Sequence, residues 1–492
     1  MSLAQAIEAL KRKDFAEAVN LADRARDESE AFFLIKGLSY SALNDWQNAQ
    51  IAFTQAVSKF PANAMFWLNK GIAEENLLLT DEAVKSLRKC LDVNPAQAEA
   101  CGNLSNLYRQ KSHFADAEDM ARKALELGAA QADALNSLGL ALQGQGKHDE
   151  AEAQFTKALQ IEPDNAPTLA NMANLEADRF NFEAAWPLYE RAYKASDNPV
   201  IKHDEALARL LSGDYERGFY LFEYRLQMPR MQRIMPLCPK WTGENLSGKK
   251  LLITAEQGLG DVIHFCRYQE LLPVDCDIVW AVPKTLVRFL SPMLRGDVLT
   301  ETEALPKCDF YLPLLSMPFM TSRRMLTLEE SGLRPLSFTT PTLPHSGKKR
   351  KIGIVWTGSS THMRNHERSM PLSMFGDLLK QTDADFYAPF VGNTLDDIGD
   401  MPIQRLDHLI NDFADTAALI WQMDYLITVD TAAAHLAGLL GVEAFLLLPK
   451  CPDWRWGMAG NKTPWYPSIT IIRQKERGDW VGVISELRKS ML

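Results

Sequence analysis

The sequence predicts an α + α/β protein, in which an N-terminal solenoid of paired helices is followed by two Rossmann-like lobes. Two observations lead to this prediction. In the first half, prolines and small residues recur with a fixed period, as Pro61 and Pro95 show (95 − 61 = 34). In the second half, segments rich in β-branched and aromatic residues alternate with helical segments, which is typical of parallel sheets covered by helices.

The repeat extends to the residues around each proline. The same shift carries one set of small and aromatic residues onto another: Gly37 to Gly71, Ala49 to Ala83, Phe53 to Leu87 and Ala56 to Cys90. Two further periods lead to Pro163, and the unit between them lacks the proline but keeps Ser105, Tyr108 and Ala117. Small residues let two helices approach closely, and proline ends a helix because it cannot donate the helical hydrogen bond.

This period and these residue types resemble the tetratricopeptide (TPR) repeat, a pair of antiparallel helices. The resemblance implies about six repeats and a terminal cap near residues 207–226, which together occupy residues 1–230. Because stacked helix pairs curve into a concave groove, we expect the array to bind a protein or peptide. The periodic aromatic and alanine residues themselves are expected to form its core.

Composition narrows the class of protein. The 492 residues carry 63 acidic and 53 basic side chains, a formal charge of -10, which argues against a general nucleic-acid binder. The 7 cysteines are scattered without a CxxC pair, so we expect them to be reduced and structural. No apolar run is long enough to span a bilayer and no leader is evident, which favours a cytoplasmic protein.

In the second half, the predicted strands cover residues 251–254, 278–282, 310–312, 352–356, 386–391, 425–429 and 444–448. A Pro/Ser/Lys-rich stretch at 334–350 separates them and predicts a hinge. We therefore expect a linker at 231–248 and two lobes at 249–340 and 351–492, each with its sheet covered on both faces. Ligands of such sheets bind beyond the carboxyl ends of the strands, so the loops there are the candidate sites.

The first such loop contains Gly258, Gly260 and Asp261, directly before the helical segment VIHFCRY. Two glycines permit a tight turn that exposes backbone N–H groups at the start of a helix. Asp261 has two interpretations at this position. It could cap the helix, or it could be a general base that takes a proton from an acceptor hydroxyl.

The loop after IGIVW begins with Thr357, Gly358, Ser359 and Ser360 and continues through a basic run. Its cationic and hydroxyl side chains could bind phosphate oxygens by charge-assisted hydrogen bonds, or the loop could simply be solvated. The residues in question are His362, Arg364, His366, Arg368 and Ser369.

The third loop lies within YLITVDTAAAHLAGLLG, residues 425–441. A predicted strand ends at Asp430, and small residues from Thr431 onward open a helix that carries His435. Small side chains allow phosphates to approach the unpaired N–H groups of a helix. A single histidine in such a helix can equally be a core residue.

Together GLGDVIHFCRY, WTGSSTHMRNHERSMPL, DFADTAALI and VDTAAAHLAGLLG resemble the bacterial TPR-fused glycosyltransferases related to the ADP-heptose:lipopolysaccharide heptosyltransferases. The tail from Pro452 to Trp480 fits the same group, and the arrangement is more distantly similar to O-GlcNAc transferase. The resemblance implies a GT-B unit of two lobes, with the acceptor side in the first lobe and the sugar nucleotide in the second.

The resemblance also implies roles for individual residues. Asp261 matches the proposed catalytic base of the heptosyltransferases, with Gly258, Gly260, His264 and Arg267 on the acceptor side. The donor-binding positions are Thr357, Gly358, Arg364, Arg368, Ser369, Gly392, Asp430, Thr431, Ala432, Ala433 and His435. Ala432 stands where the wider family has glycine, and the segment APFVG before Gly392 departs from the family pattern.

The function that this implies is a metal-independent protein O-glycosyltransferase. It would use a nucleotide sugar as co-substrate and no resident cofactor, since Asp412 and Asp415 fall at a helix start rather than in a metal-binding DxD motif. Relatives of this layout point to flagellin as the protein acceptor and to a nonulosonic acid as the sugar. The alternatives are a transferase that extends lipopolysaccharide or another glycan, and a non-catalytic TPR scaffold.

Overall fold

The computed structural model describes residues 3–25, 27–228, 236–333, 340–344, 347, 350–359, 362 and 364–491. The start of the predicted linker (231–235), most of the predicted hinge (334–350) and Ser360 lie outside the described residues. The chain divides into two compact units, residues 1–175 and 176–492. Each unit is described by itself.

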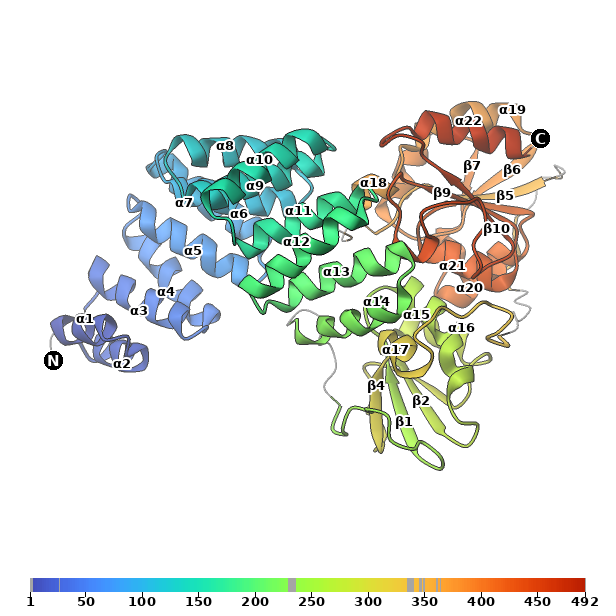
Figure 1. The fold of residues 1–492 in the computed structure, drawn as a ribbon, viewed down its shortest axis with the longest axis horizontal. Coiled ribbons are helices and arrows are strands. Elements are labelled where there is room, and N and C mark those ends of the chain that lie inside the picture. The colour runs from blue at the N-terminus through green and yellow to red at the C-terminus, as the bar shows by residue number, and fades with distance from the viewer. Residues whose placement is uncertain are drawn as a thin grey trace. The chain divides into compact units, whose positions relative to one another are not determined.

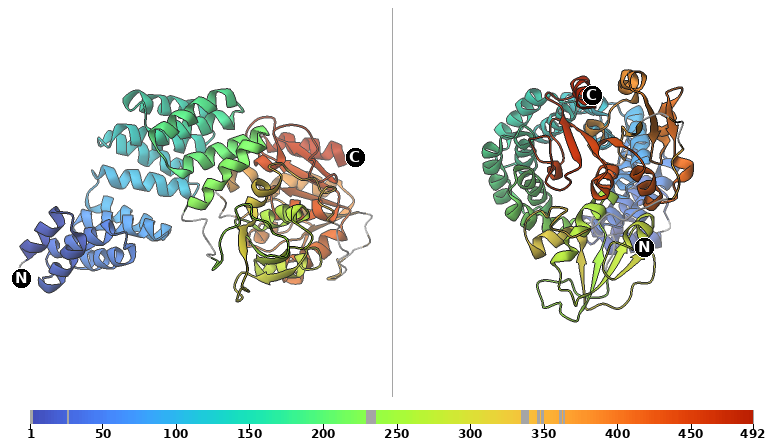
Figure 2. Two further views of the ribbon diagram at one scale, coloured as in Figure 1. Left: turned by 60° about the horizontal axis from the view of Figure 1, so that its bottom comes forward. Right: turned by 90° about the vertical axis from the view of Figure 1, so that its right-hand side faces the viewer.

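The first unit is built from pairs of antiparallel helices, each of which packs against the next pair (Figures 1 and 2). Its helices are α1 Leu3–Lys11, α2 Phe15–Ala25, α3 Glu30–Ala42, α4 Trp46–Lys59, α5 Ala64–Asn76, α6 Thr80–Val93, α7 Ala98–Gln110, α8 Phe114–Glu126, α9 Gln131–Gly144 and α10 His148–Ile161, and α11 Ala166–Asp178 begins in it. This arrangement confirms the predicted solenoid.

The 34-residue period is visible in the backbone as well as in the side chains. One residue in the turn between the two helices of a pair has a positive φ, and these residues follow one another at intervals of 34: Asn44, Leu78, Ser112, Gly146 and Phe180. The unit that lacks the terminal proline therefore has the same turn as its neighbours. Its helices, α7 and α8, are as regular as the others.

The glycines of the repeat mark the closest contacts between paired helices. A Cβ on Gly37 would lie 2.3 Å from the ring of Phe53, and a Cβ on Gly139 would lie 2.5 Å from the ring of Phe155. Both phenylalanines are fully buried. The sequence pairs Gly37 with Phe53 and Gly139 with Phe155 because an aromatic ring fills the space that the missing side chain leaves.

The repeat pattern continues into the second unit, although the contacts divide the chain well before the predicted boundary at residue 230. Helices α12 Phe182–Ala195, α13 Pro199–Ser212 and α14 Tyr215–Phe222 belong to the second unit. The reason is packing, because Leu210, Phe219 and Phe222 share one hydrophobic core with the sheets. The predicted cap is thus part of the α/β unit's core.

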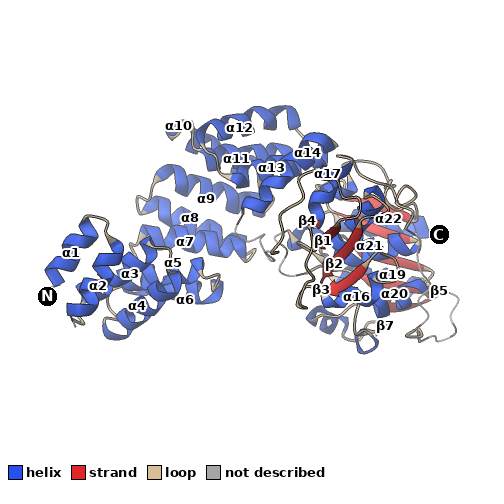
Figure 3. Cartoon of the chain, turned by 90° about the horizontal axis from the view of Figure 1, so that it is seen from below, coloured by secondary structure: helices blue, strands red, loops and turns tan. Residues whose placement is uncertain are grey.

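The second unit contains two parallel sheets (Figure 3). The first has the strand order β3-β2-β1-β4 and the second has the order β10-β9-β8-β5-β6-β7. The strands are β1 Lys250–Thr254, β2 Asp277–Val282, β3 Asp297–Thr300, β4 Phe310–Pro313, β5 Arg350–Val355, β6 Ala384–Ala388, β7 Ile403–Arg405, β8 Tyr425–Val429, β9 Ala444–Leu448 and β10 Ile469–Arg473.

All seven predicted strands are present, and β3, β7 and β10 were not predicted. Strands β3 and β7 are short edge strands of 4 and 3 residues, too brief for a clear apolar pattern. Strand β10 has 5 residues, of which Thr470 and Arg473 are partly exposed. Ordinary propensity rules favour long buried strands over such segments.

Helices cover both faces of the second sheet, as predicted. One face packs on α20 Phe413–Trp421 and α21 Ala432–Leu440. The other packs on α19 Gly376–Gln381, α22 Trp480–Met491 and the preceding short helix Leu372–Phe375. Successive residues of β9 alternate between the two cores: Leu446 lies in one and Leu447 in the other.

In the first sheet, helices cover only one of the two faces, whereas helices on both faces were expected. One face packs on α15 Leu259–Phe265 and α16 Lys284–Leu290, and α17 Met317–Thr321 contributes Met317 to the same core. The other face, with Leu252 and Val279, packs on residues from strands and loops such as Cys308. A small patch of loop residues is sufficient there because the sheet has only four strands.

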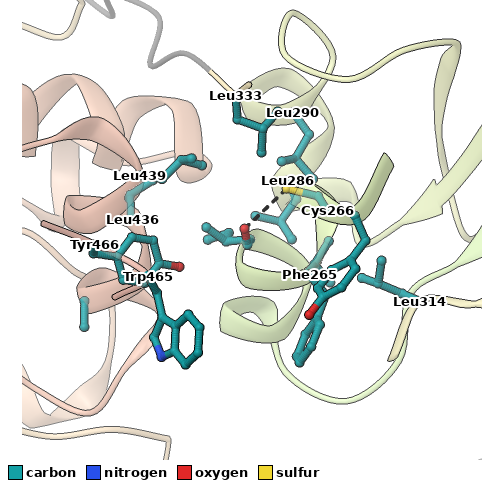
Figure 4. Close-up of a cluster of buried hydrophobic side chains, with 14 of the residues drawn as sticks. Phe265, Cys266, Leu286, Leu290, Leu314, Leu333, Leu436, Leu439, Trp465 and Tyr466 are labelled. Carbon is teal, nitrogen blue, oxygen red and sulfur yellow. Dashed lines mark hydrogen bonds between the residues drawn. The ribbon is translucent and has the colours of Figure 1, made fainter. Parts of the chain in front are cut away.

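The two sheets share one hydrophobic core, which lies on one face of each sheet. Figure 4 shows Leu436 and Leu439 of α21 facing Phe265 and Cys266 and the α16 residue Leu286 across a continuous apolar layer. Trp465 and Tyr466, from the loop before β10, close the same layer. The helices that follow β1 and β8 are therefore packed together, which determines where the ends of those strands lie.

The glycine contacts make a stability prediction. Gly139→Ala should lower the free energy of unfolding by about 1–3 kcal/mol, because its new Cβ would overlap the buried ring of Phe155. Gly102→Ala is the matched control, since it lies within α7 and a Cβ there meets nothing within 4 Å. That substitution should be neutral or stabilise by up to about 1 kcal/mol. Urea unfolding of both variants measures the difference, and equal effects would contradict this account.

Candidate active site

The strand orders indicate where each sheet can bind a ligand. In the second sheet, β5 and β8 are neighbours whose following connections run to opposite sides, and in the first sheet β1 and β4 are such neighbours. Crevices form at these switch points, beyond the carboxyl ends of the strands. The three loops singled out in the sequence follow β1, β5 and β8, so all three begin at a switch point.

The loops after β1 and β8 meet directly. A Cβ on Gly260 would lie 3.0 Å from Cδ2 of His435 and 3.4 Å from the Cα of Ala432. The N-terminal turns of α15 and α21 are therefore in van der Waals contact, and only glycine fits at position 260 without displacing its neighbours. The sequence-predicted turn with Asp261 and the predicted helix start at Thr431 lie together in the structure.

Asp261 is held by two hydrogen bonds. Its Oδ2 accepts from the backbone N–H of Gly258 at 2.9 Å, and its Oδ1 accepts from the Arg455 guanidinium at 2.6 Å. Gly258 is the N-cap residue of α15 and Asp261 lies in the first turn, so Asp261 is not the N-cap that one interpretation of the sequence expected. Its bond to the Gly258 N–H is instead the returning half of a capping box. Burial raises the pKa of Asp261, and the adjacent Arg455 opposes that shift. The carboxylate thus takes part in capping α15 and also has the raised proton affinity of a general base.

Arg455 was not identified from the sequence, although it lies in the tail segment PDWRW after β9. The residue is 7% exposed, and its Nη1 donates to Asp453 Oδ1 at 2.9 Å. Its guanidinium also lies over the rings of Trp454 and Phe265. An arginine between aromatic residues in a loop beyond a parallel strand was the available signal, because such loops carry functional groups.

A tyrosine hydroxyl joins the two histidines behind the meeting point. Tyr466 Oη lies 3.0 Å from Nδ1 of His264 and 3.1 Å from Nδ1 of His435. His435 also stacks on Trp456 with ring centroids 4.8 Å apart. Burial and the nearby guanidinium groups lower the pKa of His435 to about 3, so its imidazole is neutral at physiological pH.

Asp430 and Thr431 lie at the start of α21. Asp430 accepts a hydrogen bond from Nε1 of Trp456 at 2.8 Å. Burial, aided by the charge of Asp453, raises the pKa of Asp430 to about 6. Thr431 precedes α21 but gives it no side-chain cap, whereas the side chain of Asp412 caps α20. The first N–H groups of α21 are therefore left to other acceptors.

In the loop after β5, a serine hydroxyl connects two parts of the described backbone. Ser369 Oγ accepts from the Gly358 N–H at 3.2 Å and lies 3.1 Å from Thr357 Oγ1. Arg368 packs on the same backbone, since a Cβ on Gly358 would lie 2.5 Å from its guanidinium. The charge of Arg368 also reaches Asp430, whose pKa it lowers against the effect of burial. This loop therefore brings a cation to the start of α21.

Arg364 is used differently. It donates to Glu367 at 2.6 Å and to the carboxylate of Asp178, at the end of α11, at 3.4 Å. Arg477 binds the same two acidic residues. Of the two arginines predicted to bind phosphate, Arg364 is thus part of an ion-pair network that holds the loop, and Arg368 lies beside the helix start. Their phosphate contacts stay predictions.

Three other predicted positions do not present an accessible polar group where the starts of α15 and α21 meet. Arg267 is fully buried and donates to the carbonyls of His264 and Leu326, and His264 is equally buried. Both support the site from within the core, and a role for them in binding an acceptor remains a prediction. Gly392 is exposed after β6, and the nearest side-chain atom to its Cβ direction is Thr394 Oγ1 at 3.9 Å.

The first unit has a groove of its own. Its volume is ≈ 520 Å³, and it lies where the loops of three successive repeats adjoin. Met65 contributes an apolar surface to the groove and is 46% exposed. The groove is lined by Glu30, Lys59, Phe60, Pro61, Ala62, Asn63, Ala64, Met65, Asn94 and Gln97. This mixture of apolar, amide and charged side chains is suited to binding a polypeptide segment.

Fold and site together define a repeat protein whose helical array precedes an α/β part with a polar cluster at two facing helix starts. Comparison with known families agrees for the array. Profiles of the tetratricopeptide repeat match residues 34–98, 97–129 and 132–165. The chain therefore carries TPR repeats in its N-terminal half. A protein-interaction role is supported, because TPR arrays bind partners through their concave surfaces.

Among characterised proteins, the chain is similar to protein FlbA of Caulobacter vibrioides. The two are 23% identical over an alignment of 531 positions, which covers 97% of this chain and 87% of FlbA. Among solved structures, a tetratricopeptide repeat protein from Parabacteroides merdae matches with 20% identity and a TM-score of 0.43, covering 46% of this chain and 91% of that one. YrrB, a TPR protein with an unusual peptide-binding site, matches with 17% identity and a TM-score of 0.27, covering 36% and 93%.

No helix within the described ranges is both long enough and apolar enough to cross a membrane.

The buried histidines predict how stability depends on pH. The folded-state pKa of His435 lies below its unfolded value, so the unfolded chain binds more protons and stability falls as pH drops below ~6.5. His435→Asn should reduce this slope between pH 6.5 and 5 by up to about 1.4 kcal/mol per pH unit. Tyr466→Phe is the control, since it removes a hydrogen bond but keeps the histidine. Urea unfolding at several pH values should show the slope retained in that variant; a retained slope in His435→Asn would refute the assignment.

Proposed function

We propose that this protein is a glycosyltransferase that moves a sugar from a nucleotide-sugar donor to a hydroxyl of a protein acceptor. The two parallel sheets would be the two lobes of a GT-B unit, with the donor at the ends of β5 and β8. The observation that carries the proposal is the contact between the start of α15, with Asp261, and the start of α21. This contact places a partly buried carboxylate beside a helix start that lacks a side-chain cap.

The donor side is supported by charge and by backbone geometry. Phosphate oxygens favour helix N-termini and arginine side chains, and α21 begins beside Arg368 and Arg455. Ala432 and Ala433 carry only methyl groups, so their side chains add little steric hindrance at this helix start. The N–H groups of this helix start and the two arginine side chains would stabilise the leaving group, which is a nucleoside diphosphate or monophosphate depending on the sugar nucleotide.

The chemical step would proceed as follows. The acceptor oxygen forms a bond to the anomeric carbon while the bond from that carbon to the phosphate oxygen breaks. The phosphate leaves with the electron pair, and the hydroxyl proton passes to the carboxylate of Asp261. The raised pKa of Asp261 suits this role, because a base with higher proton affinity accepts the proton more readily.

The acceptor side is inferred from the array. TPR repeats support a protein partner, and the groove around Met65 has the composition of a peptide site. We propose that the array recruits the protein to be modified, with flagellin and a nonulosonic acid as the first acceptor and donor to test. A transferase that extends lipopolysaccharide or another glycan would share the donor site but need no protein acceptor.

One observation favours a second candidate, a non-catalytic TPR scaffold. The carboxylate of Asp261 is bonded to Arg455 at 2.6 Å, and a carboxylate engaged in an ion pair is a weaker base. The two functions differ in ligand binding. A panel of ADP-, GDP-, UDP- and CMP-sugars should raise the melting temperature of an active transferase for at least one base, whereas a scaffold would respond to none.

The test of the enzymatic function is Asp261→Asn. This variant should still bind the donor, but its rate of donor hydrolysis and of sugar transfer should fall about 10²–10⁴-fold, because the amide cannot accept the proton. Donor turnover can be followed by release of the nucleotide, with water as acceptor. Undiminished turnover in the variant would eliminate Asp261 as the base. The same assay should be unaffected by EDTA if the reaction is metal-independent.

The role of the array is tested with a pair of surface variants. Met65→Asp places a charge in the groove, and we expect it to reduce sugar transfer to protein in an extract of the source cells by about tenfold, as for loss of a central apolar contact. Ile51→Asp is the matched control, because Ile51 is 44% exposed, close to the 46% of Met65, but does not line the groove. Donor hydrolysis should be normal in both variants. Equal transfer by the two would argue against this groove as the recruitment site.

A further inference from the structure

Arg455 links three carboxylates at the meeting point of the two sheets. Its Nη2 donates to Asp261 at 2.6 Å, and its Nη1 donates to Asp453 at 2.9 Å. Its charge also acts on Asp430. Asp261 comes from the first sheet's loop and the other two carboxylates come from the second sheet's loops. The charge of Arg455 therefore acts at once on a carboxylate from the first sheet's loop and on two carboxylates from the second sheet's loops.

The guanidinium is not fully satisfied. Its Nε–H is buried and has no hydrogen-bond partner among the described residues, although the residue is only 7% exposed. Leaving a buried hydrogen-bond donor unpaired destabilises a protein, and more so when the donor is charged. The unpaired Nε–H of Arg455 is explained if an oxygen atom of a bound ligand accepts a hydrogen bond from it.

Two independent features beside Arg455 suit an anionic ligand. The nine-residue helix α21 begins without a side-chain cap, and Arg368 lies over the backbone of Gly358 close enough for its charge to act on Asp430. Cations and unpaired N–H groups together attract phosphate more strongly than either does alone. The charge of Arg455 acts on the same carboxylate, Asp430, so both cations lie near the start of α21.

We infer that Arg455 is a donor-controlled latch on Asp261: without donor it binds the Asp261 carboxylate, and phosphate oxygens of the donor draw the guanidinium away and release that carboxylate. The inference rests on the proposed function. No covalent bond changes in this exchange. The guanidinium keeps its positive charge and the carboxylate its negative charge, and one ion pair replaces another.

The latch would give the reaction an order. Burial raises the pKa of Asp261, and Arg455 is the largest influence that lowers it. Release from Arg455 therefore leaves Asp261 with a higher proton affinity, and it becomes a competent base only when the donor is bound. Arg455 acts through Asp261 and is a positioning residue. The same exchange reconciles a catalytic carboxylate with its engagement in an ion pair in the donor-free protein.

The test measures binding of inorganic pyrophosphate to the full chain by isothermal titration calorimetry. In the donor-free state, Asp261 and pyrophosphate compete for Arg455. Asp261→Asn should therefore tighten pyrophosphate binding by about ten- to a hundredfold, the size of one hydrogen bond between charged groups. The same substitution should lower the melting temperature, because it removes one of the two ion pairs of Arg455 and leaves only the one to Asp453. A gain in affinity together with a loss of stability is not expected from structural damage alone.

A double-mutant cycle separates the latch from a simple change in net charge. In an Arg455→Gln background, and in an Arg455→Lys background that keeps the charge and preserves folding, Asp261→Asn should no longer tighten pyrophosphate binding. If the effect of Asp261→Asn is the same in all backgrounds, or if this substitution weakens binding in the wild-type background, the latch is wrong while the proposed anion site stands.

Absence of any binding has a different meaning. If neither pyrophosphate nor ADP, GDP, UDP or CMP binds to the wild-type chain, there is no anion site at α21 for Arg455 to serve. That outcome would overturn the proposed donor site and the latch together, and it differs from binding that is merely uncoupled from Asp261.

Discussion

The close approach of α15 and α21 is the constraint on which the geometry of the candidate site depends. Gly260 permits it, because any larger residue would meet His435 and the backbone of Ala432. The contact lies on top of an apolar layer common to both sheets, in which Leu436 and Phe265 take part. Packing of this kind is close to crystalline density, so the two helix starts above it are fixed in position. Two loops that are distant in sequence are thereby held at one place.

The polar groups at this place are not independent of one another. Arg455 binds Asp261 and Asp453, Asp430 is bonded to Trp456, and Trp456 stacks on His435. A buried network with most of its members satisfied holds its geometry well, and its unsatisfied members carry the largest energetic consequences. The unpaired Nε–H of Arg455 is such a member. For this reason the electrostatic behaviour of Asp261 cannot be judged from its own loop alone.

The sequence allowed the repeat array, the seven main strands and the three loops to be predicted, because each depends on a local pattern. Period, alternation of apolar residues and glycine-rich turns are all visible within a few tens of residues. Arg455 and Tyr466 were missed for the opposite reason. Tyr466 matters because its hydroxyl joins His264 and His435, and these contacts span 202 and 31 residues. No repeat, alternation of apolar residues or turn motif marks these two pairs in the sequence.

The extent of the α/β unit's core explains another difference between prediction and structure. By its repeat pattern, the array runs to α14, yet Leu210 and Phe219 belong to the core beneath the sheets. At the end of α11, Asp178 binds Arg364 and Arg477, and Arg364 lies in the loop after β5. The last repeats thus serve as structural support for a loop of the candidate site. Their contribution to function can be made through that loop, independently of any partner that the earlier repeats bind.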